Sequence, residues 1–264
     1  MKERLDMLLV TKGLCDSLER AKTTIMAGLV FVYNQRVDKA GTKIDVNAAI
    51  RVKGHKTPYV GRGGLKLAKA LNAFAITLTG KTMMDVGAST GGFSDCAMQH
   101  GAVKVFAVDV GYGQLDWKLR TDPRVINLER TNIRNVTLAM IGTPVDFISI
   151  DVSFISLLKI MPAVTSLIRS DGDMAVLIKP QFEAPRNQVE KGGLVKNPVV
   201  HSQVIQSIVE GMIEYGLSPR HLTYSPVKGA DGNIEYLLHL KKSPMAGTVT
   251  PEIIDTIVKE SHQM

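Results

Sequence analysis

Residues 83–94 read Met-Met-Asp-Val-Gly-Ala-Ser-Thr-Gly-Gly-Phe-Ser, a short apolar run that ends in an acid and continues into small residues. This pattern is typical of a buried strand followed by a tight turn and a helix. Glycines at positions 87, 91 and 92 permit positive φ and leave no Cβ between the backbone and a ligand. The helix that follows would direct free N–H groups toward the same place. The stretch therefore predicts a ligand-binding turn.

A second strand pattern begins at Lys104 and ends in an acid, Asp109, which suits a ribose diol. A dinucleotide site would show the spacing G-x-G-x-x-G, whereas the first turn has G-x-x-x-G-G and follows Asp85. A carboxylate suits the cationic methionine part of S-adenosylmethionine (SAM) better than it suits a pyrophosphate. The two turns together favour SAM, although any tight strand-to-helix turn needs glycine.

Strands and helices alternate from residue 82 onward. The patterns predict strands at 82–86, 104–109, 125–128, 146–151 and 173–179, and helices at 90–100, 114–120, 136–141, 156–168 and 199–215. Two further strands, at 222–224 and 234–240, flank a turn-rich loop. The predicted fold class is α/β, a Rossmann-like methyltransferase sheet of seven mostly parallel strands, with the last strand antiparallel. A packing helix is expected from Pro251.

Positive charge is concentrated in the first quarter of the chain. Residues 1–60 contain 11 Lys and Arg against 6 Asp and Glu, and residues 61–264 contain the other 21 against 19, giving +7 in all. This favours a docking module for a polyanion, usually nucleic acid, with a solvated basic surface as the alternative. No apolar run approaches the roughly 18 residues of a membrane span, and the start is no signal peptide, so a cytoplasmic protein is expected. The isolated Cys15 and Cys96 predict neither a disulfide nor a metal site.

The first 55 residues predict a small α+β unit that suits binding. One helix covers residues 4–12 and ends at Gly13. Asp16 or Ser17 caps a second helix, which Gly28 closes. Short strands follow at 29–33, 36–37 and 49–52, with a polar turn at Asn34-Gln35.

These residues resemble the RNA-binding domain named after ribosomal small-subunit protein four. The resemblance rests on Arg4-Leu5-Asp6 with Gly13-Leu14, and on Ser17-x-x-Arg20-Ala21 followed by Gly28-x-Val30-x-Val32. It implies that basic residues contact RNA, namely Arg4, Arg20, Lys22 and Arg36. The usual Asn-Gly turn is Asn34-Gln35 here. A segment with Gly and Pro follows, so the predicted domains are 1–55 for RNA binding, a linker at 56–62, and 63–264 for catalysis.

In an open α/β sheet the site lies at the carboxyl ends of the strands. The predicted strand ends carry Asp85, Asp109, Asn132 just beyond the third strand, Asp151 and Lys179. Asp151 and Lys179 are unusual, because each ends an otherwise apolar strand. One such charge is often structural, but two beside a nucleoside-type turn indicate catalysis.

The residues after the fourth predicted strand indicate which kind of atom receives the methyl group. Nitrogen nucleophiles on a base are commonly held by an Asn/Asp-Pro-Pro-aromatic turn, whereas this position has Asp151-Val152-Ser153-Phe154. A carbon nucleophile would need an attacking cysteine, and neither cysteine is placed there. An oxygen nucleophile needs a base. Lysine acts as a base where burial and a neighbouring cation favour its neutral form, which Lys66 beside Lys179 would provide, with Asp151 or Glu235 orienting the ammonium groups.

The order Lys66, Asp151, Lys179, Glu235 is similar to the Lys-Asp-Lys-Glu tetrad of the FtsJ-like ribose 2′-O-methyltransferases. Longer blocks resemble the TlyA family of hemolysin-named rRNA methyltransferases, at residues 85–93, 109–115, 128–132, 153–157 and 179–183. The resemblance implies SAM-dependent 2′-O-methylation of cytidine in ribosomal RNA (rRNA), with ribosomal subunits as partners. It makes Lys179 the central catalytic lysine and the other three residues its partners.

The same resemblance assigns cofactor contacts to residues of the two turns and the third strand end: Asp85, Gly87, Ala88, Ser89, Thr90, Gly91, Gly92, Phe93, Asp109 and Asn132. One departure lies in the linker, where Tyr59 stands in place of the tryptophan that relatives often carry before the valine. No metal is implied, and nothing obliges a dimer.

Three other functions stay open. A membrane-lysing protein, which the hemolysin name suggests, is opposed by the lack of a spanning segment or a basic helix of lytic length. An RNA-binding ribosome-assembly factor with a vestigial site is opposed by the complete tetrad. A small-molecule O-methyltransferase leaves the basic N-terminal module without a role. The sequence identifies neither the modified nucleotide nor the ribosomal subunit.

Overall fold

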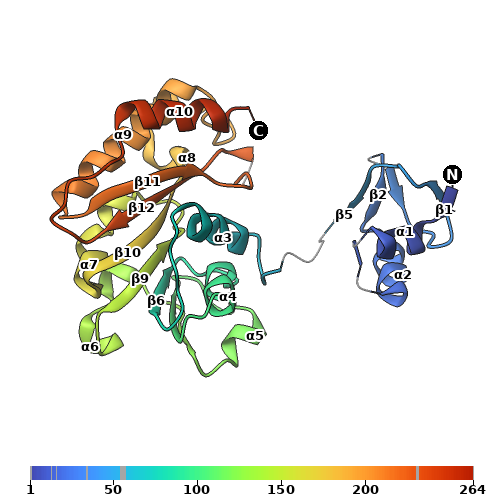
Figure 1. The fold of residues 1–264 in the computed structure, drawn as a ribbon, viewed down its shortest axis with the longest axis horizontal. Helices are drawn as coiled ribbons and strands as arrows, with labels where there is room; N and C mark the ends of the chain where they lie inside the picture. Colours follow the sequence, from blue (N-terminus) through green and yellow to red (C-terminus); the bar gives the residue numbers. More distant parts are fainter. Residues whose placement is uncertain are drawn as a thin grey trace. The chain divides into compact units, whose positions relative to one another are not determined.

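The computed structural model describes residues 2–12, 14–15, 17–33, 35–53, 58–229 and 232–263. The chain divides into two compact units, Met1–Thr57 and Pro58–Met264, which are described separately (Figure 1). The predicted helix end at Gly13, the predicted cap at Asp16 and the turn residue Asn34 lie outside the described residues. Residues 54–57 of the predicted linker region and part of the 228–233 loop also lie outside them.

The N-terminal unit is a small α+β fold, as predicted. Helices α1 (Leu5–Thr11) and α2 (Leu18–Met26) pack on an antiparallel sheet in the order β3 (Gln35–Val37), β2 (Val30–Val32) and β5 (Ile50–Val52). Ser17 caps α2, because its Oγ accepts a hydrogen bond from the N–H of Arg20 at 3.2 Å. The sequence did not predict a second strand pair, β1 (Lys2–Arg4) with β4 (Lys43–Asp45), because three-residue strands show too little alternation.

The C-terminal unit contains the predicted seven-stranded sheet. Its strand order is β11 (Ser218–Tyr224), β12 (Tyr236–Lys241), β10 (Ile168–Ile178), β9 (Val145–Ile150), β6 (Thr82–Val86), β7 (Lys104–Val108) and β8 (Val125–Leu128). Strand β12, the last in the chain, pairs antiparallel with both neighbours, whereas the pairs among β10, β9, β6, β7 and β8 are parallel. The carboxyl ends of five parallel strands therefore meet at one edge.

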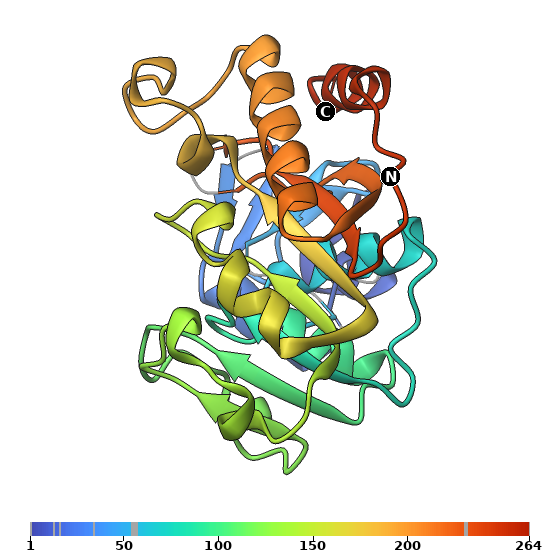
Figure 2. The ribbon, with the colours of Figure 1, turned by 90° about the vertical axis from the view of Figure 1, so that its left-hand side faces the viewer.

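Helices cover both faces of this sheet (Figures 1 and 2). One face packs against α3 (Gly63–Ala73), α4 (Gly92–Gln99) and α5 (Trp117–Arg120). The other packs against α6 (Leu138–Ile141), η1 (Ile133–Asn135), η2 (Leu157–Lys159), α7 (Met161–Leu167), α9 (Pro198–Glu214) and α10 (Pro251–Ser261). Alternate strand residues serve opposite faces, as Met83 and Met84 do.

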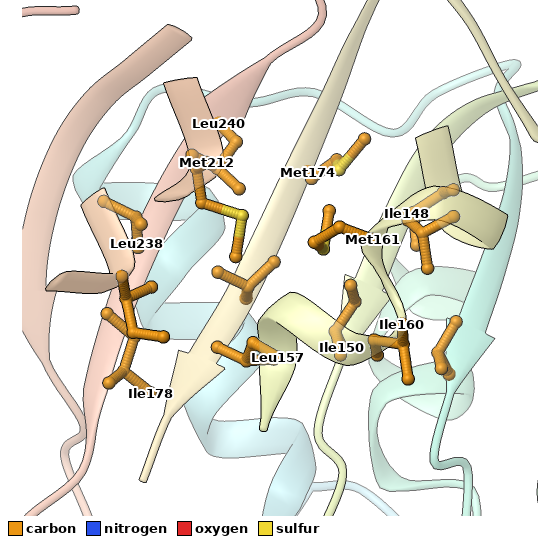
Figure 3. Close-up of a cluster of buried hydrophobic side chains, with 14 of the residues drawn as sticks. Ile148, Ile150, Leu157, Ile160, Met161, Met174, Ile178, Met212, Leu238 and Leu240 are labelled. Atoms are coloured by element: carbon orange, nitrogen blue, oxygen red, sulfur yellow. The ribbon is translucent and has the colours of Figure 1, made fainter. Parts of the chain in front are cut away.

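The larger core lies on the α7 and α9 face. Figure 3 shows part of it, with side chains from three neighbouring strands meeting helix residues: Ile148, Ile150, Met174, Ile178, Leu238, Leu240, Met161 and Met212. Each fully buried side chain of this size contributes about 1.5–3 kcal/mol of transfer free energy. This packing holds in place the carboxyl ends of the strands, where the predicted polar site residues lie.

Two elements differ from the sequence prediction near this edge. The predicted helix over 156–168 is divided into η2 and α7, with Pro162 near the start of α7, where its missing N–H costs nothing. A four-residue helix, α8 (Pro180–Glu183), follows Lys179 directly and was not predicted, because its single turn is too short to show periodicity. A 3-10 turn, η3 (Arg186–Gln188), follows it.

Candidate active site

The glycine-rich turn connects the ends of three neighbouring strands. Gly87 and Gly91 have φ of +84° and +93°, a region that favours glycine. The N–H groups of Gly87 and Ala88 both donate to the carbonyl of Val108, at 2.9 and 3.1 Å, which ties the turn to β7. A Cβ on Gly87 would lie 2.9 Å from the carbonyl carbon of Asp151. Gly87 therefore packs directly against the backbone that carries one of the predicted catalytic residues.

Asp85 lies behind this turn and lines neither of the two cavities described below. Its side chain is fully buried and accepts hydrogen bonds from the Ser94 N–H at 2.9 Å, the Ser94 Oγ at 2.7 Å and the Ser149 Oγ at 3.1 Å. Burial raises the pKa of the Asp85 carboxyl to about 6, even though these three donors favour the ionised form. The carboxylate thus joins β6, α4 and β9 beneath the turn.

One cavity of about 380 Å³, the Asp109 cavity, opens between the turn and the ends of β7 and β9. The Asp109 carboxylate is fixed by two backbone donors, the Ser89 N–H at 2.7 Å and the Gly111 N–H at 2.6 Å. Each of its oxygens keeps a further lone pair for a ligand hydroxyl. Asn132 lines the same cavity, and apolar walls are provided by Val108, Val110, Ile133 and Ile160.

A second cavity of about 450 Å³ adjoins the first at Gly87 and Ser89. It brings together the four residues that the sequence predicted as catalytic, here called the tetrad: Lys66, Asp151, Lys179 and Glu235. Lys66 Nζ lies 2.6 Å from Glu235 Oε2 and 3.5 Å from Asp151 Oδ2. Lys179 Nζ lies 2.5 Å from Asp151 Oδ1. The tetrad side chains are between 3% and 18% exposed, so these ion pairs are shielded from water.

The fold explains why these four residues meet. Asp151 and Lys179 follow the adjacent parallel strands β9 and β10, and Glu235 directly precedes β12, the antiparallel neighbour of β10. Lys66 reaches them from the first turns of α3, where the helix macrodipole disfavours a cation. The short contact with Glu235 offsets this cost. Asp151 therefore lies between the side chains of Lys66 and Lys179 and contacts both of them.

Ser153 and Phe154 are among the residues of this cavity that the sequence did not predict as site residues. Ser153 Oγ accepts a hydrogen bond from Lys179 Nζ at 3.0 Å. Phe154 has a φ of +63° and is 90% exposed, with its ring centroid 4.9 Å from that of Phe182. The only sequence signal for either was its place in the Asp-Val-Ser-Phe turn after β9. Of the predicted cofactor residues, Gly91 and Asp85 line neither of these two cavities, and the other eight each line at least one of them.

The predicted RNA-binding residues lie on the surface of the N-terminal unit. Arg20, Lys22 and Arg36 are exposed. Arg4 is also exposed but pairs with Asp6 at 2.7 Å, and this hydrogen bond lowers the pKa of the Asp6 carboxyl. The structure thus leaves three of the four basic side chains without a paired carboxylate among the residues it describes.

The sheet order, the reversed last strand and the glycine turn at the first parallel strand end define the class of SAM-dependent methyltransferases. Comparison with known families agrees: residues 59–242 match the FtsJ-like methyltransferase model, and residues 3–50 match the S4 domain model. The chain belongs to the FtsJ-like methyltransferase family and carries an S4 domain at its N-terminus.

Three similar proteins cover most of the chain. It is 48% identical to YqxC of Bacillus subtilis, named as a candidate rRNA methyltransferase, over 99% of this chain and 95% of that protein. It is 41% identical to the 16S/23S rRNA (cytidine-2′-O)-methyltransferase TlyA of Mycobacterium tuberculosis, over 91% and 90%. A solved structure of a hemolysin-named protein from Streptococcus thermophilus is 43% identical, with a TM-score of 0.78 over 99% of this chain and 96% of that one.

Within residues 2–53 and 58–263, apart from the few undescribed positions, no helix is long and apolar enough to cross a bilayer. In the same part of the chain, no cluster of three or more His, Cys, Asp or Glu side chains could hold a metal ion.

Proposed function

We propose that this protein transfers the methyl group of SAM to a ribose 2′-hydroxyl of a cytidine in rRNA. The observation that carries the proposal is the meeting of Lys66, Asp151, Lys179 and Glu235 in one cavity beside the glycine turn. The names of the relatives supply the substrate class, since one of them methylates cytidine 2′-oxygens in 16S and 23S rRNA. A ribosomal substrate also implies that the protein works in the cytoplasm.

The residues present fit SAM. The Asp109 carboxylate, fixed by two backbone N–H groups, would bind the ribose diol, and the apolar walls near Ile133 would enclose the adenine. The methionine part would lie along Gly87 and Ala88, where a side chain on residue 87 would collide with Asp151. When bound, SAM supplies a methyl group on a sulfonium, which an oxygen nucleophile displaces in line.

Lys179 is the residue that we expect to remove the proton of the 2′-hydroxyl. A neutral amine has two N–H donors and one lone pair. Asp151 and Ser153 occupy two directions around Nζ, so the remaining direction is available to the substrate hydroxyl. As the new C–O bond forms and the C–S bond breaks, the hydroxyl proton passes to Nζ. The resulting ammonium is held by Asp151 at 2.5 Å.

Lys66 and Glu235 would act by positioning Asp151. Their short contact at 2.6 Å holds Lys66 Nζ near the second oxygen of Asp151, so the carboxylate is fixed from both sides. Once Lys179 has taken the proton, two ammonium groups and two carboxylates balance in charge, which limits the cost of burying them. The exposed Phe154, at the mouth of the same cavity, offers a face on which the base of the target nucleotide could stack.

The domain roles follow from the same proposal. Residues 1–55 would dock the RNA, residues 63–264 would catalyse the transfer, and residues 56–62 would join them. Within this joining segment, the Val60 N–H donates to Asp95 Oδ2 at 2.8 Å, and the Pro58 carbonyl accepts from Gln99 Nε2 at 2.8 Å. Both contacts are to α4, which follows the glycine turn, so the segment touches the element that borders the cofactor site.

The proposal is tested by transfer of labelled methyl from SAM to purified ribosomal subunits and to free rRNA, followed by nuclease mapping. We expect labelled dinucleotides that resist alkali, because a 2′-O-methyl group blocks cleavage at that position. Label on a base, or no transfer to any RNA by protein that binds SAM, would overturn the proposed reaction.

A further inference from the structure

The N-terminal unit contains two aromatic residues, Phe31 and Tyr33, and neither belongs to its hydrophobic core. That core is built from aliphatic side chains, among them Val30 and Val32 on either side of Phe31. Because strand residues alternate, the Phe31 ring lies on the opposite, outer face of β2. Tyr33, at the end of this strand, is 63% exposed. The unit thus leaves both rings outside the interior that would normally bury them.

Arginines flank Phe31 on both neighbouring strands. Phe31 is paired with Arg36 on β3 and with Arg51 on β5, so the three residues form one row across the sheet. The Arg51 guanidinium lies 4.6 Å from the Phe31 ring centroid. The Arg36 guanidinium lies against Gly28, where an added Cβ would collide with it. Among the described residues, neither arginine is paired with a carboxylate.

We propose that this outer face, the Phe31 platform (Phe31, Tyr33, Arg36 and Arg51), binds unpaired nucleotides of the RNA substrate. The inference rests on the proposed function for the identity of that substrate. Phe31 stacks on a base, and the arginines contact the adjoining phosphates. Aromatic rings beside cations are suited to single-stranded RNA, whose bases are free to stack, whereas the bases of a duplex are already stacked on each other.

The platform is distinct from the basic residues of α2. Ala21 and Ile25 place α2 against the inner face of the sheet, in the core that Val30 and Val32 complete. Arg20 and Lys22 are therefore on the helical side of the unit, and Phe31 is on the other side of the sheet. The unit, residues 1–57, carries 11 Lys and Arg against 6 Asp and Glu. This net positive charge favours binding to the phosphate backbone of a nucleic acid.

The test is a binding titration of the full-length protein with a labelled, unpaired oligoribonucleotide and with a duplex of the same composition. Phe31→Leu keeps an apolar side chain but removes the ring, and we expect it to weaken binding of the unpaired RNA roughly 5- to 100-fold. Phe31→Tyr keeps the ring and should bind within about 2-fold of wild type. Met7→Ala, which shortens another exposed apolar residue of the same unit, is the matched control and should have no effect.

A second variant tests the cationic part. Arg51→Gln should lower the slope of log affinity against log salt by about 0.7, the loss of one phosphate contact on a single strand. Thermal unfolding of each variant checks that the unit is folded.

Unchanged binding by Phe31→Leu, or an equal loss for duplex and unpaired RNA, would overturn the platform. If wild type methylates rRNA while folded Phe31→Leu binds unpaired RNA normally, the platform is wrong and the proposed function stands. If wild type binds no RNA and methylates none, both fail.

Discussion

Replacing Gly87 with alanine probes the contact between the glycine turn and the tetrad. Gly87 has a φ of +84°, and an alanine there costs about 1–2 kcal/mol in backbone strain alone. The new Cβ would also lie 2.9 Å from the carbonyl carbon of Asp151 and nearer still to its oxygen, whereas ordinary contact begins at 3.4 Å. The end of β9 must therefore move by more than about 0.5 Å, because that shift relieves the overlap with the carbonyl carbon but not the overlap with the nearer oxygen.

The expected effect has two parts. Overpacking adds about 1–3 kcal/mol to the backbone strain, so Gly87→Ala should lower the free energy of unfolding by about 2–5 kcal/mol. A displacement of 1 Å in a catalytic group can cost about 100-fold in rate, so a shift of half that size should lower kcat by at least about 10-fold. The catalytic loss arises because Asp151 forms an ion pair with Lys179, so a displaced Asp151 also displaces the Lys179 amine.

Gly113→Ala is the matched control, because Gly113 has a φ of +71° and no neighbouring atom within 4 Å of the added Cβ. It should show the backbone strain, about 1–2 kcal/mol, with kcat unchanged. Denaturant unfolding measures the first quantity, and single-turnover methyl transfer at saturating SAM and RNA measures the second. Equal kcat values for the two variants would refute the reasoning that the turn positions Asp151.

Three further predictions concern the buried polar groups. Glu235→Gln removes the negative charge nearest Lys66, so that its remaining ion pair is the longer one with Asp151, and should destabilise the protein by about 3 kcal/mol. The double variant with Lys66→Met should regain stability but not methyl transfer, and a stable but fully active double variant would contradict this. Ser153→Ala removes a hydrogen bond to Lys179 and should lower kcat about 10-fold with SAM affinity unchanged in calorimetry; an unchanged kcat would exclude this role. Burial raises the pKa of the Asp85 carboxyl from its ordinary 3.8 to about 6, so the folded state binds this proton more tightly than the unfolded state does. The protonated carboxyl therefore stabilises the folded state at acidic pH, and this stabilisation is lost as the pH rises through 6. The unfolding free energy of wild type minus that of Asp85→Asn should therefore fall by about 2 kcal/mol between about pH 4 and pH 7, and parallel curves in urea unfolding would contradict the raised pKa.

The sequence predicted the parallel strands and the glycine turn well, because each is a local pattern. Strand β6 and strand β8 lie at the predicted residues, 82–86 and 125–128. An acid after an apolar strand is equally visible, which is why Asp109 and Asp151 could be assigned to strand ends. The sheet order then brings Asp151 and Lys179 together, since β9 and β10 are neighbours.

Features that depend on tertiary packing were not visible. Glu235 lies 169 residues from Lys66 in the chain, so no local pattern connects the two residues. They were assigned to one site only because the order of the four residues resembles the tetrad of a known family. The same limit applies to Asp85: the sequence shows an acid at the turn, but only the positions of Ser94 and Ser149 show that its carboxylate is turned into the core. Strand β10 begins at Ile168, five residues before the predicted start. The sequence Asp171-Gly172 is typical of a turn, so the strand was predicted to begin after it. In the structure the strand continues through these residues with a shift in its register against β9.

The most direct test of the proposed chemistry is single-turnover transfer of labelled methyl from SAM to rRNA by Lys179→Met. Lys191→Met, which removes an exposed lysine, is the control. We expect Lys179→Met to lose about 100- to 10,000-fold in rate, the usual contribution of a general base, with SAM affinity and RNA affinity close to wild type. Transfer by Lys179→Met at the control rate would contradict the assignment of Lys179 as the base, and a loss that is fully explained by weaker SAM binding would place it in the cofactor site instead.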